Sequence, residues 1–282
     1  MNNELSNLFK KLQPNNMSIE DQIEQLLTGT VLFGTIIIDT YSIDETKDIY
    51  DAMDIVCNRK NYFSFDHYGI YCFWDYYTKE ILYIGLSNNL RSRFGQHNGL
   101  LGKKGKGNKY KYIKEYFKEK ERLGYTLLVQ SPYEHNDLFL DDKNDEIKQI
   151  EGALIEEFNI KNNRLPKWND IGGSKVGRQP SYIKRYGSIF SMIVGEKIDF
   201  LNARSTLREL SQDVVLLSYE SDLNIIRGRM YKYGESFDEA VEKLIQFNNF
   251  YYKSGALQAG YSNIRLMNIR NNSYINKNLV LF

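Results

Sequence analysis

The pattern of apolar and polar positions first indicates a β-hairpin early in the chain. Residues 68–76 form an aromatic-rich run typical of a strand, and residues 81–85 form a second, shorter run. Residues 78–80 between them have the composition of a turn. Because successive side chains of a strand point to opposite faces, Tyr71 and Tyr83 are expected on the same side of the hairpin. An ordinary cross-strand aromatic pair would give the same pattern, so the two tyrosines by themselves do not identify a site.

Helical periodicity and capping residues predict further elements on both sides of this hairpin. A helix that begins at Ser87 or Asn88 would carry Arg93 and His97 on one face, because they are four residues apart. The other expected elements are a helix capped by Ser18 and ending at Gly29, a buried strand over residues 31–38, a basic helix over about 109–122, a strand over 125–130 and a helix over about 145–160.

The C-terminal part of the chain is predicted to be mainly helical. The glycine-rich residues 171–177 are the best linker candidate. Two capping boxes follow, Thr206 with Glu209 and Ser236 with Glu239, and between them Ser221 could cap a helix that stops near Gly234. Three short helices at this spacing are typical of a helix-turn-helix unit.

Composition limits the classes of function. The chain has 282 residues, 42% hydrophobic and 26% charged, with a net charge of only +1, so nucleic-acid affinity would have to come from local patches. The two cysteines suggest neither a disulfide framework nor a metal site, which favours a cytoplasmic setting. The longest apolar run, residues 31–38, is shorter than the ~20 residues that a membrane-spanning helix needs, so no membrane partner is expected.

Three residue types that cleave phosphodiesters occur in a suggestive order. Such a site needs a base, a cation for the transition state and a metal ligand. Tyr or His could act as the base and Arg93 as the cation, since a guanidinium stays charged and matches phosphate geometry. Glu151 lies on or beside the apolar stripe of its helix, where an ionised carboxylate is unfavourable unless it is paired or metal-bound. The alternatives are a solvated face for Arg93 and His97, and an edge position for Glu151.

The strings Gly69-Ile70-Tyr71 and Tyr83-Ile84-Gly85, followed by Arg93, His97 and Glu151 with Leu154-Ile155, resemble the GIY-YIG nuclease family over about residues 68–169. The resemblance implies an active site of Tyr71, Tyr83, Arg93 and Glu151, with His97 as an auxiliary group and Mg²⁺ or Mn²⁺ bound to Glu151. It also implies a nearby Asn. Asn169 fits the local signature and Asn163 fits the spacing, while pairing Glu157 with Asn169 would restore the spacing but lose the Leu-Ile pair.

The fold implied is α/β (α+β): a small mixed or antiparallel three-stranded sheet flanked by helices, with a mainly helical C-terminal region. We expect an N-terminal helical extension over residues 1–60, a nuclease domain over 61–175 and a DNA-binding region over 176–282. The implied mechanism is in-line hydrolysis. Tyr71 acts as general base or positions the water, Arg93 stabilises the developing charge, and the metal on Glu151 assists the leaving 3′ oxygen. A free Tyr has a pKa near ~10, so a base role requires a nearby cation or metal.

Two segments are expected to contact DNA. The basic stretch 103–122, with tyrosines interleaved, is either a phosphate-tracking surface or a solvated helix. Segment 205–245 resembles the helix-turn-helix modules of phage and mobile-element nucleases, and a helix starting near Asp222 would then read the DNA groove. The alternative is a helical cap that buries Leu223, Ile226 and Met230. The expected contacts are Lys103, Lys104, Lys106 and Lys109 in the first segment, and Asn224, Arg227, Arg229 and Lys232 in the second.

Together these features predict a metal-dependent, site-specific endonuclease for double-stranded DNA, of homing or phage type, in a bacterial or phage-infected cell. A type II restriction enzyme is the first alternative, and a homodimer that makes a double-strand break on DNA would favour it. A repair-type nuclease that acts on distorted DNA and a non-catalytic DNA-binding protein are the others.

Overall fold

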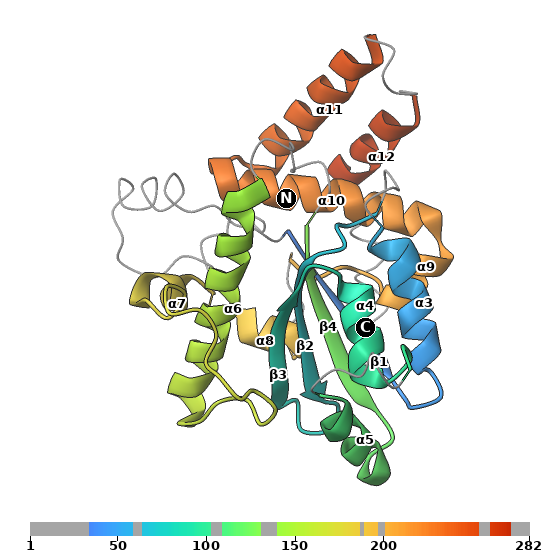
Figure 1. The fold of residues 1–282 in the computed structure, drawn as a ribbon. Helices are drawn as coiled ribbons and strands as arrows, with labels where there is room; N and C mark the ends of the chain where they lie inside the picture. The colour runs from blue at the N-terminus through green and yellow to red at the C-terminus, as the bar shows by residue number, and fades with distance from the viewer. Residues whose placement is uncertain are drawn as a thin grey trace.

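The computed structural model describes residues 34–58, 64–102, 109–130, 140–186, 189–196, 201–253 and 260–271. Four antiparallel strands form a sheet in the order β1-β4-β2-β3, as Figure 1 shows. Their bounds are β1 Thr35–Tyr41, β2 Gly69–Asp75, β3 Ile81–Ser87 and β4 Leu123–Val129. The α+β class is therefore confirmed, and the sheet has four described strands where three were expected. The fourth is β1, which overlaps the buried strand predicted over residues 31–38 in the N-terminal extension and pairs along its length with β4.

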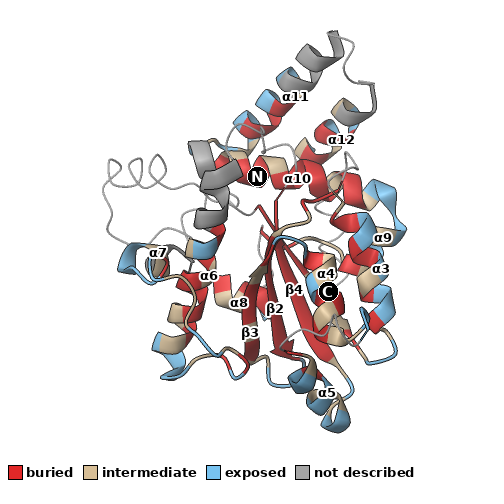
Figure 2. Cartoon of the chain, viewed as in Figure 1, coloured by how far each residue is buried: buried red, intermediate tan, exposed pale blue. Residues whose placement is uncertain are grey.

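Helices cover both faces of the sheet (Figure 1). One buried cluster contains Tyr71 and Phe73 and packs against α3, α4 and α5, whereas the other contains Ile70 and Trp74 and packs against α6 and α8. The alternation predicted for residues 68–76 is thus correct. Because both faces are covered, the central strands β2 and β4 are buried along their whole length, as Figure 2 shows. The helices are α3 Thr46–Val56, α4 Leu90–Asn98, α5 Tyr110–Glu119, α6 Leu140–Asn162, α7 Pro180–Tyr186, α8 Phe190–Ile193, α9 Leu207–Gln212, α10 Val214–Tyr233, α11 Phe237–Lys253 and α12 Gly260–Arg270.

The segment before residue 60 is part of this body. Ile36 on β1 donates its backbone N–H to Leu201 at 2.8 Å and accepts from Ala203 at 2.8 Å, so the chain after residue 200 lies along the outer side of β1. Tyr41 at the end of β1 donates to Asn98 on α4. The expected N-terminal extension therefore contributes a strand and a helix to the same core in its described part, residues 34–58. The predicted helix from Ser18 to Gly29 lies outside the described residues.

Residues 171–177 do not form a linker. A Cβ at Gly177 would stand 2.1 Å from the carbonyl oxygen of Gln149, and one at Gly152 would stand 2.5 Å from that of Ser174. The glycines therefore let this segment pack directly on the backbone of α6. Sequence composition alone does not separate such close packing from a flexible connection.

The C-terminal helices confirm the predicted capping boxes but not the predicted reader helix. Thr206 and Ser236 each bond reciprocally with the Glu three residues later. Ser221, in contrast, is buried inside α10, a 20-residue helix capped by Asp213 and ended by Gly234 in the left-handed conformation. The structure agrees with the helical-cap alternative, because Leu223, Ile226 and Met230 pack between α10, α11 and α12. None of the described helices is long and apolar enough to span a membrane.

Candidate active site

The glycines of the hairpin give its two tyrosines their positions. A Cβ at Gly85 would lie 2.6 Å from Cε1 and 2.8 Å from the hydroxyl oxygen of Tyr83, so the Tyr83 ring lies over Gly85. A Cβ at Gly69 would lie 2.5 Å from the carbonyl oxygen of Leu128, where β2 approaches β4. Tyr71 pairs with Gly85 across the hairpin, which leaves room for the neighbouring ring. The two tyrosines are therefore brought together as predicted, with ring centroids 5.7 Å apart.

His97 joins this pair from α4. Its Nε2 is 2.7 Å from the Tyr71 hydroxyl oxygen, and its ring centroid is 5.9 Å from that of Tyr83. The helix that carries it is capped by Asn89, whose side chain accepts from the backbone N–H of Ser92; the expected cap was one or two residues earlier. Three of the predicted site residues are thus in mutual contact on one face of the sheet.

Burial controls the protonation of these three groups. It raises the pKa of Tyr71 well above 10, and the neighbouring Tyr83 raises it further. Burial also raises the pKa of Tyr83, against the lowering effects of the Tyr71 hydroxyl and of Lys109. It lowers the pKa of His97 to about 3, with Arg93 and Lys109 acting in the same direction. At neutral pH His97 is therefore uncharged and Tyr71 is a phenol, which disfavours the expected role of Tyr71 as a free base.

Arg93 lies on the exposed side of α4, one helical turn before His97. Among the described residues, its guanidinium has no ion-pair or hydrogen-bond partner. Its positive charge still lowers the pKa of Tyr71, Tyr83 and His97, and so favours the deprotonated form of each. An accessible guanidinium with unused donors is well suited to bind a phosphate.

Glu151 approaches from α6, which packs on the opposite face, and meets the site at edge strand β3. Burial raises its pKa from 4.5 to about 7, and a hydrogen bond from the backbone of Leu86 only partly opposes this. Within the described part of the chain no cation pairs with this carboxylate. A partly buried carboxylate without a cation fits a divalent metal ion, since Mg²⁺ commonly takes one or two protein carboxylates and keeps several waters. The described residues contain no group of three or more His, Cys, Asp or Glu placed to hold a metal.

Asn169 holds the edge strand that carries the second tyrosine. Its Nδ2 donates to the Ile84 carbonyl at 2.8 Å, and its Oδ1 accepts from the Ile84 N–H at 3.0 Å. Asn163 instead ends α6 as an exposed residue in the left-handed conformation, with φ of 54°. Glu157 pairs with Lys161 on its own helix. Asn169 is therefore the asparagine that reaches the site, where it positions the backbone between Tyr83 and Gly85.

Lys109 was expected to contact DNA, and this prediction is wrong for the conformation described. The residue is buried, its Nζ is 2.6 Å from Oδ2 of Asp170, and the Tyr83 ring centroid is 5.2 Å from the same nitrogen. It belongs to the interior of the candidate site. Sequence reasoning missed the pairing because Asp170 lies 61 residues further along the chain.

The predicted groove contacts on α10 are also overturned at two positions. Asn224 is buried and donates to the Val129 carbonyl at 3.2 Å. Arg227 is buried and bonds to Thr35 and Glu220, because this part of α10 packs against the sheet. Arg229 forms a two-pronged ion pair with Glu235. The remaining predicted contacts, Lys103, Lys104, Lys106 and the side chain of Lys232, lie outside the described residues.

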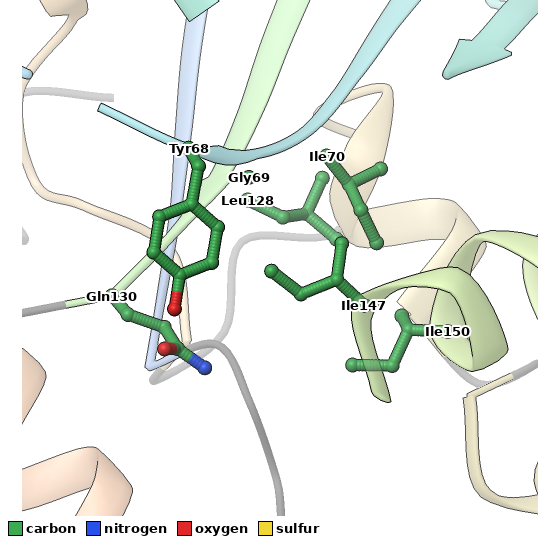
Figure 3. A pocket seen from close by; sticks show the side chains of 7 residues that line it. All are labelled: Tyr68, Gly69, Ile70, Leu128, Gln130, Ile147 and Ile150. Carbon is green, nitrogen blue, oxygen red and sulfur yellow. The ribbon is translucent and has the colours of Figure 1, made fainter. Parts of the chain in front are cut away.

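A small pocket lies elsewhere, between α6 and the ends of β2 and β4. Figure 3 shows Tyr68 and Gln130 as its polar lining groups and Ile147 and Ile150 of α6 on the other side. Its empty volume is about 220 Å³. Because the lining holds no carboxylate, histidine or cation, the pocket offers no group for phosphodiester chemistry.

Comparison of the chain with family models, with curated proteins and with solved structures finds no match. The functional argument therefore depends on the residues and their geometry. These place Tyr71, Tyr83 and His97 in contact, with Arg93 and Lys109 close enough to shift their pKa values and Glu151 close enough to shift that of Tyr83.

Proposed function

We propose that this chain is a divalent-metal-dependent endonuclease for double-stranded DNA, with a site of the GIY-YIG type. The observation that carries the proposal is a pair of unsatisfied charges beside the tyrosine–histidine cluster. Arg93 presents a guanidinium with no anionic partner among the described residues, and Glu151 is a partly buried carboxylate with no described cation. A phosphodiester and a divalent cation together would complement both groups.

The residues divide the chemistry as follows. Arg93 binds a non-bridging phosphate oxygen and stabilises the charge that develops there. Tyr71 and His97 hold the Tyr83 hydroxyl through the hydrogen-bonded cluster, and Asn169 fixes the strand beneath it. Glu151 would hold Mg²⁺ or Mn²⁺, which when bound supplies positive charge at the phosphate. Water then attacks phosphorus as the bond to the 3′ oxygen breaks.

DNA binding is supported by the first half of α5. Lys111 and Lys114 are exposed there, and neither has an ion-pair partner among the described residues. Near the end of the helix, Lys118 pairs with Glu115, and Lys120, directly after the helix, pairs with Asp75. The free lysines adjoin the active site through Lys109, which directly precedes α5, so phosphates flanking the cleavage point could pass along them.

The preference for a homing or phage type rested on an exposed reader helix, and the burial of α10 removes that support. A restriction enzyme and a repair nuclease are therefore equal alternatives within the proposed class. Cleavage of specific duplex sites, compared with branched DNA, separates them. The proposed setting is the cytoplasm of a bacterial or phage-infected cell.

The test is cleavage of supercoiled and linear DNA by the full chain, with Mg²⁺ or with EDTA, beside Glu151→Gln. The matched control is Glu156→Gln on the same helix, because the Glu156 carboxylate accepts from Asn159 and has no described contact with the site residues. Metal-dependent fragments that disappear in Glu151→Gln and persist in Glu156→Gln would support the proposal. DNA retention without cleavage, equal with metal and EDTA, would instead support a non-catalytic DNA-binding protein.

A further inference from the structure

The ion pair between Lys109 and Asp170 lies beside the second tyrosine of the site. Lys109 immediately precedes α5, and Asp170 follows Asn169, whose amide grips the backbone of Ile84. The pair therefore joins α5 to the segment that holds β3. Its Nζ–Oδ2 distance is 2.6 Å.

The two partners differ in their contact with solvent. The Lys109 side chain is 5% exposed, whereas that of Asp170 is 69% exposed. Water screens the charge of the carboxylate more than that of the ammonium. The site residues therefore experience a net positive potential from the pair. Burying a lysine ammonium in this way is unfavourable unless the charge is paired or otherwise stabilised.

The ammonium faces two aromatic rings. Its distance is 5.2 Å to the Tyr83 ring centroid and 5.5 Å to that of Tyr112, both within the range of a cation–π contact. Tyr112 in turn stacks on Trp168 with an interplanar angle of 10°, and Trp168 bonds to the Leu82 carbonyl of β3. Lys109 is thus fixed from several sides against the ring whose hydroxyl belongs to the proposed site.

We propose that Lys109 is a positioning residue of the active site: held by Asp170, its ammonium fixes the Tyr83 ring over Gly85 and supplies a second positive charge beside the Tyr83 hydroxyl. This inference rests on the proposed nuclease function. Arg93 is then the cation that touches phosphate, and Lys109 acts through Tyr83. The electrostatic influence of Lys109 on both Tyr83 and His97 agrees with that arrangement.

The first test separates this role from DNA contact. Lys109→Met keeps the aliphatic stem and removes the charge. We expect single-turnover cleavage to fall roughly tenfold to a hundredfold, less than the roughly hundredfold to thousandfold loss when a group in direct contact with the developing charge is removed, because Lys109 acts through Tyr83. DNA affinity in EDTA should stay at the parent value, because Lys109 is buried. Lost affinity with an unchanged cleavage rate would overturn the inference in favour of a DNA contact. Lys118→Met, an exposed α5 lysine, is the control.

The second test asks whether Lys109 acts through Tyr83, and it uses a double-mutant cycle of Lys109→Met with Tyr83→Phe. If Lys109 acts through the Tyr83 hydroxyl, removing the charge should have little further effect in the Tyr83→Phe background. Effects that multiply would overturn the inference, since they would mean independent roles. The third arm is rescue. Lys109→Arg keeps the charge and should recover most of the rate, and Lys109→Arg as slow as Lys109→Met would also overturn the inference.

The parent protein distinguishes the two levels of the argument. A parent that does not cleave DNA fails the proposed function, and this inference falls with it. A parent that cleaves normally, with Lys109→Met equally fast, fails only the role of Lys109. Urea unfolding of each variant shows whether a lost rate reflects a lost fold.

Discussion

The partly buried carboxylate of Glu151 makes the stability of the metal-free protein depend on pH. Its pKa rises from 4.5 to about 7 on folding, so the folded chain binds this proton more tightly than the unfolded chain does. Stability from this group is therefore complete below pH 4.5 and is lost as the pH rises through about 7. The difference corresponds to about 3 kcal/mol at pH 8, as an upper value, since each pKa unit is worth about 1.4 kcal/mol.

Replacing the carboxylate by a neutral amide of the same shape should remove this dependence. Glu151→Gln keeps an oxygen that can accept from the Leu86 backbone. In EDTA we expect the variant to be more stable than the parent by up to about 3 kcal/mol at pH 8, and by less than about 1 kcal/mol at pH 5. At pH 8 a metal that binds the folded carboxylate should narrow this difference, because metal at ten times its Kd stabilises the parent by about 1.4 kcal/mol and leaves the variant unchanged.

The assay is urea unfolding followed by circular dichroism at pH 5 and pH 8, in EDTA and in Mg²⁺, with Glu156→Gln as the matched control. A Glu151→Gln effect of equal size at both pH values would refute the burial argument. Equal stabilisation of parent and variant by Mg²⁺ would refute the assignment of Glu151 as the metal ligand.

Two further predictions follow from contacts of the site and its surroundings. Gly85→Ala should lower cleavage at least tenfold while DNA affinity stays unchanged, because the new methyl group displaces the Tyr83 ring; parent-like single-turnover cleavage would contradict the observed packing. Lys111→Gln with Lys114→Gln should reduce the slope of log affinity against log salt by roughly 2, as each phosphate contact contributes about 0.9. In the same filter-binding series, the control Lys118→Gln should leave that slope unchanged, because Lys118 is already paired with a carboxylate. An unchanged slope in the double variant would favour the solvated-helix interpretation.

Local signals in the sequence predicted much of the fold. The hairpin, the capping boxes and the long helix with Glu151 follow from alternation, periodicity and side-chain caps that act within a few residues. The proximity of Tyr71, Tyr83 and His97 also followed, because a strand pair and the next helix are close in the chain. Arg93 is exposed, which agrees both with the expected phosphate-binding role and with the solvated-face alternative.

Contacts between distant segments were not predictable in this way. The place of β4 between β1 and β2 depends on pairing across the whole domain, and no local pattern encodes it. Arg227 and Asn224 are residue types that often contact bases in a DNA groove. In this fold their hydrogen-bond partners on β1 and β4 keep both side chains buried. The burial of Lys109 could not be predicted for the same reason, since it depends on a carboxylate partner that is distant in the sequence.

The bonds between the chain after residue 200 and the outer side of β1 have a practical consequence for protein engineering. A fragment cut at residues 61 and 175 would lose β1, expose the edge of β4 and leave the face around Tyr71 without α3 and α9. Exposed edges of this kind promote aggregation. A transplantable unit that keeps the candidate site would therefore need to extend at least from residue 34 to the end of α10, since Arg227 on this helix bonds to Thr35 of β1.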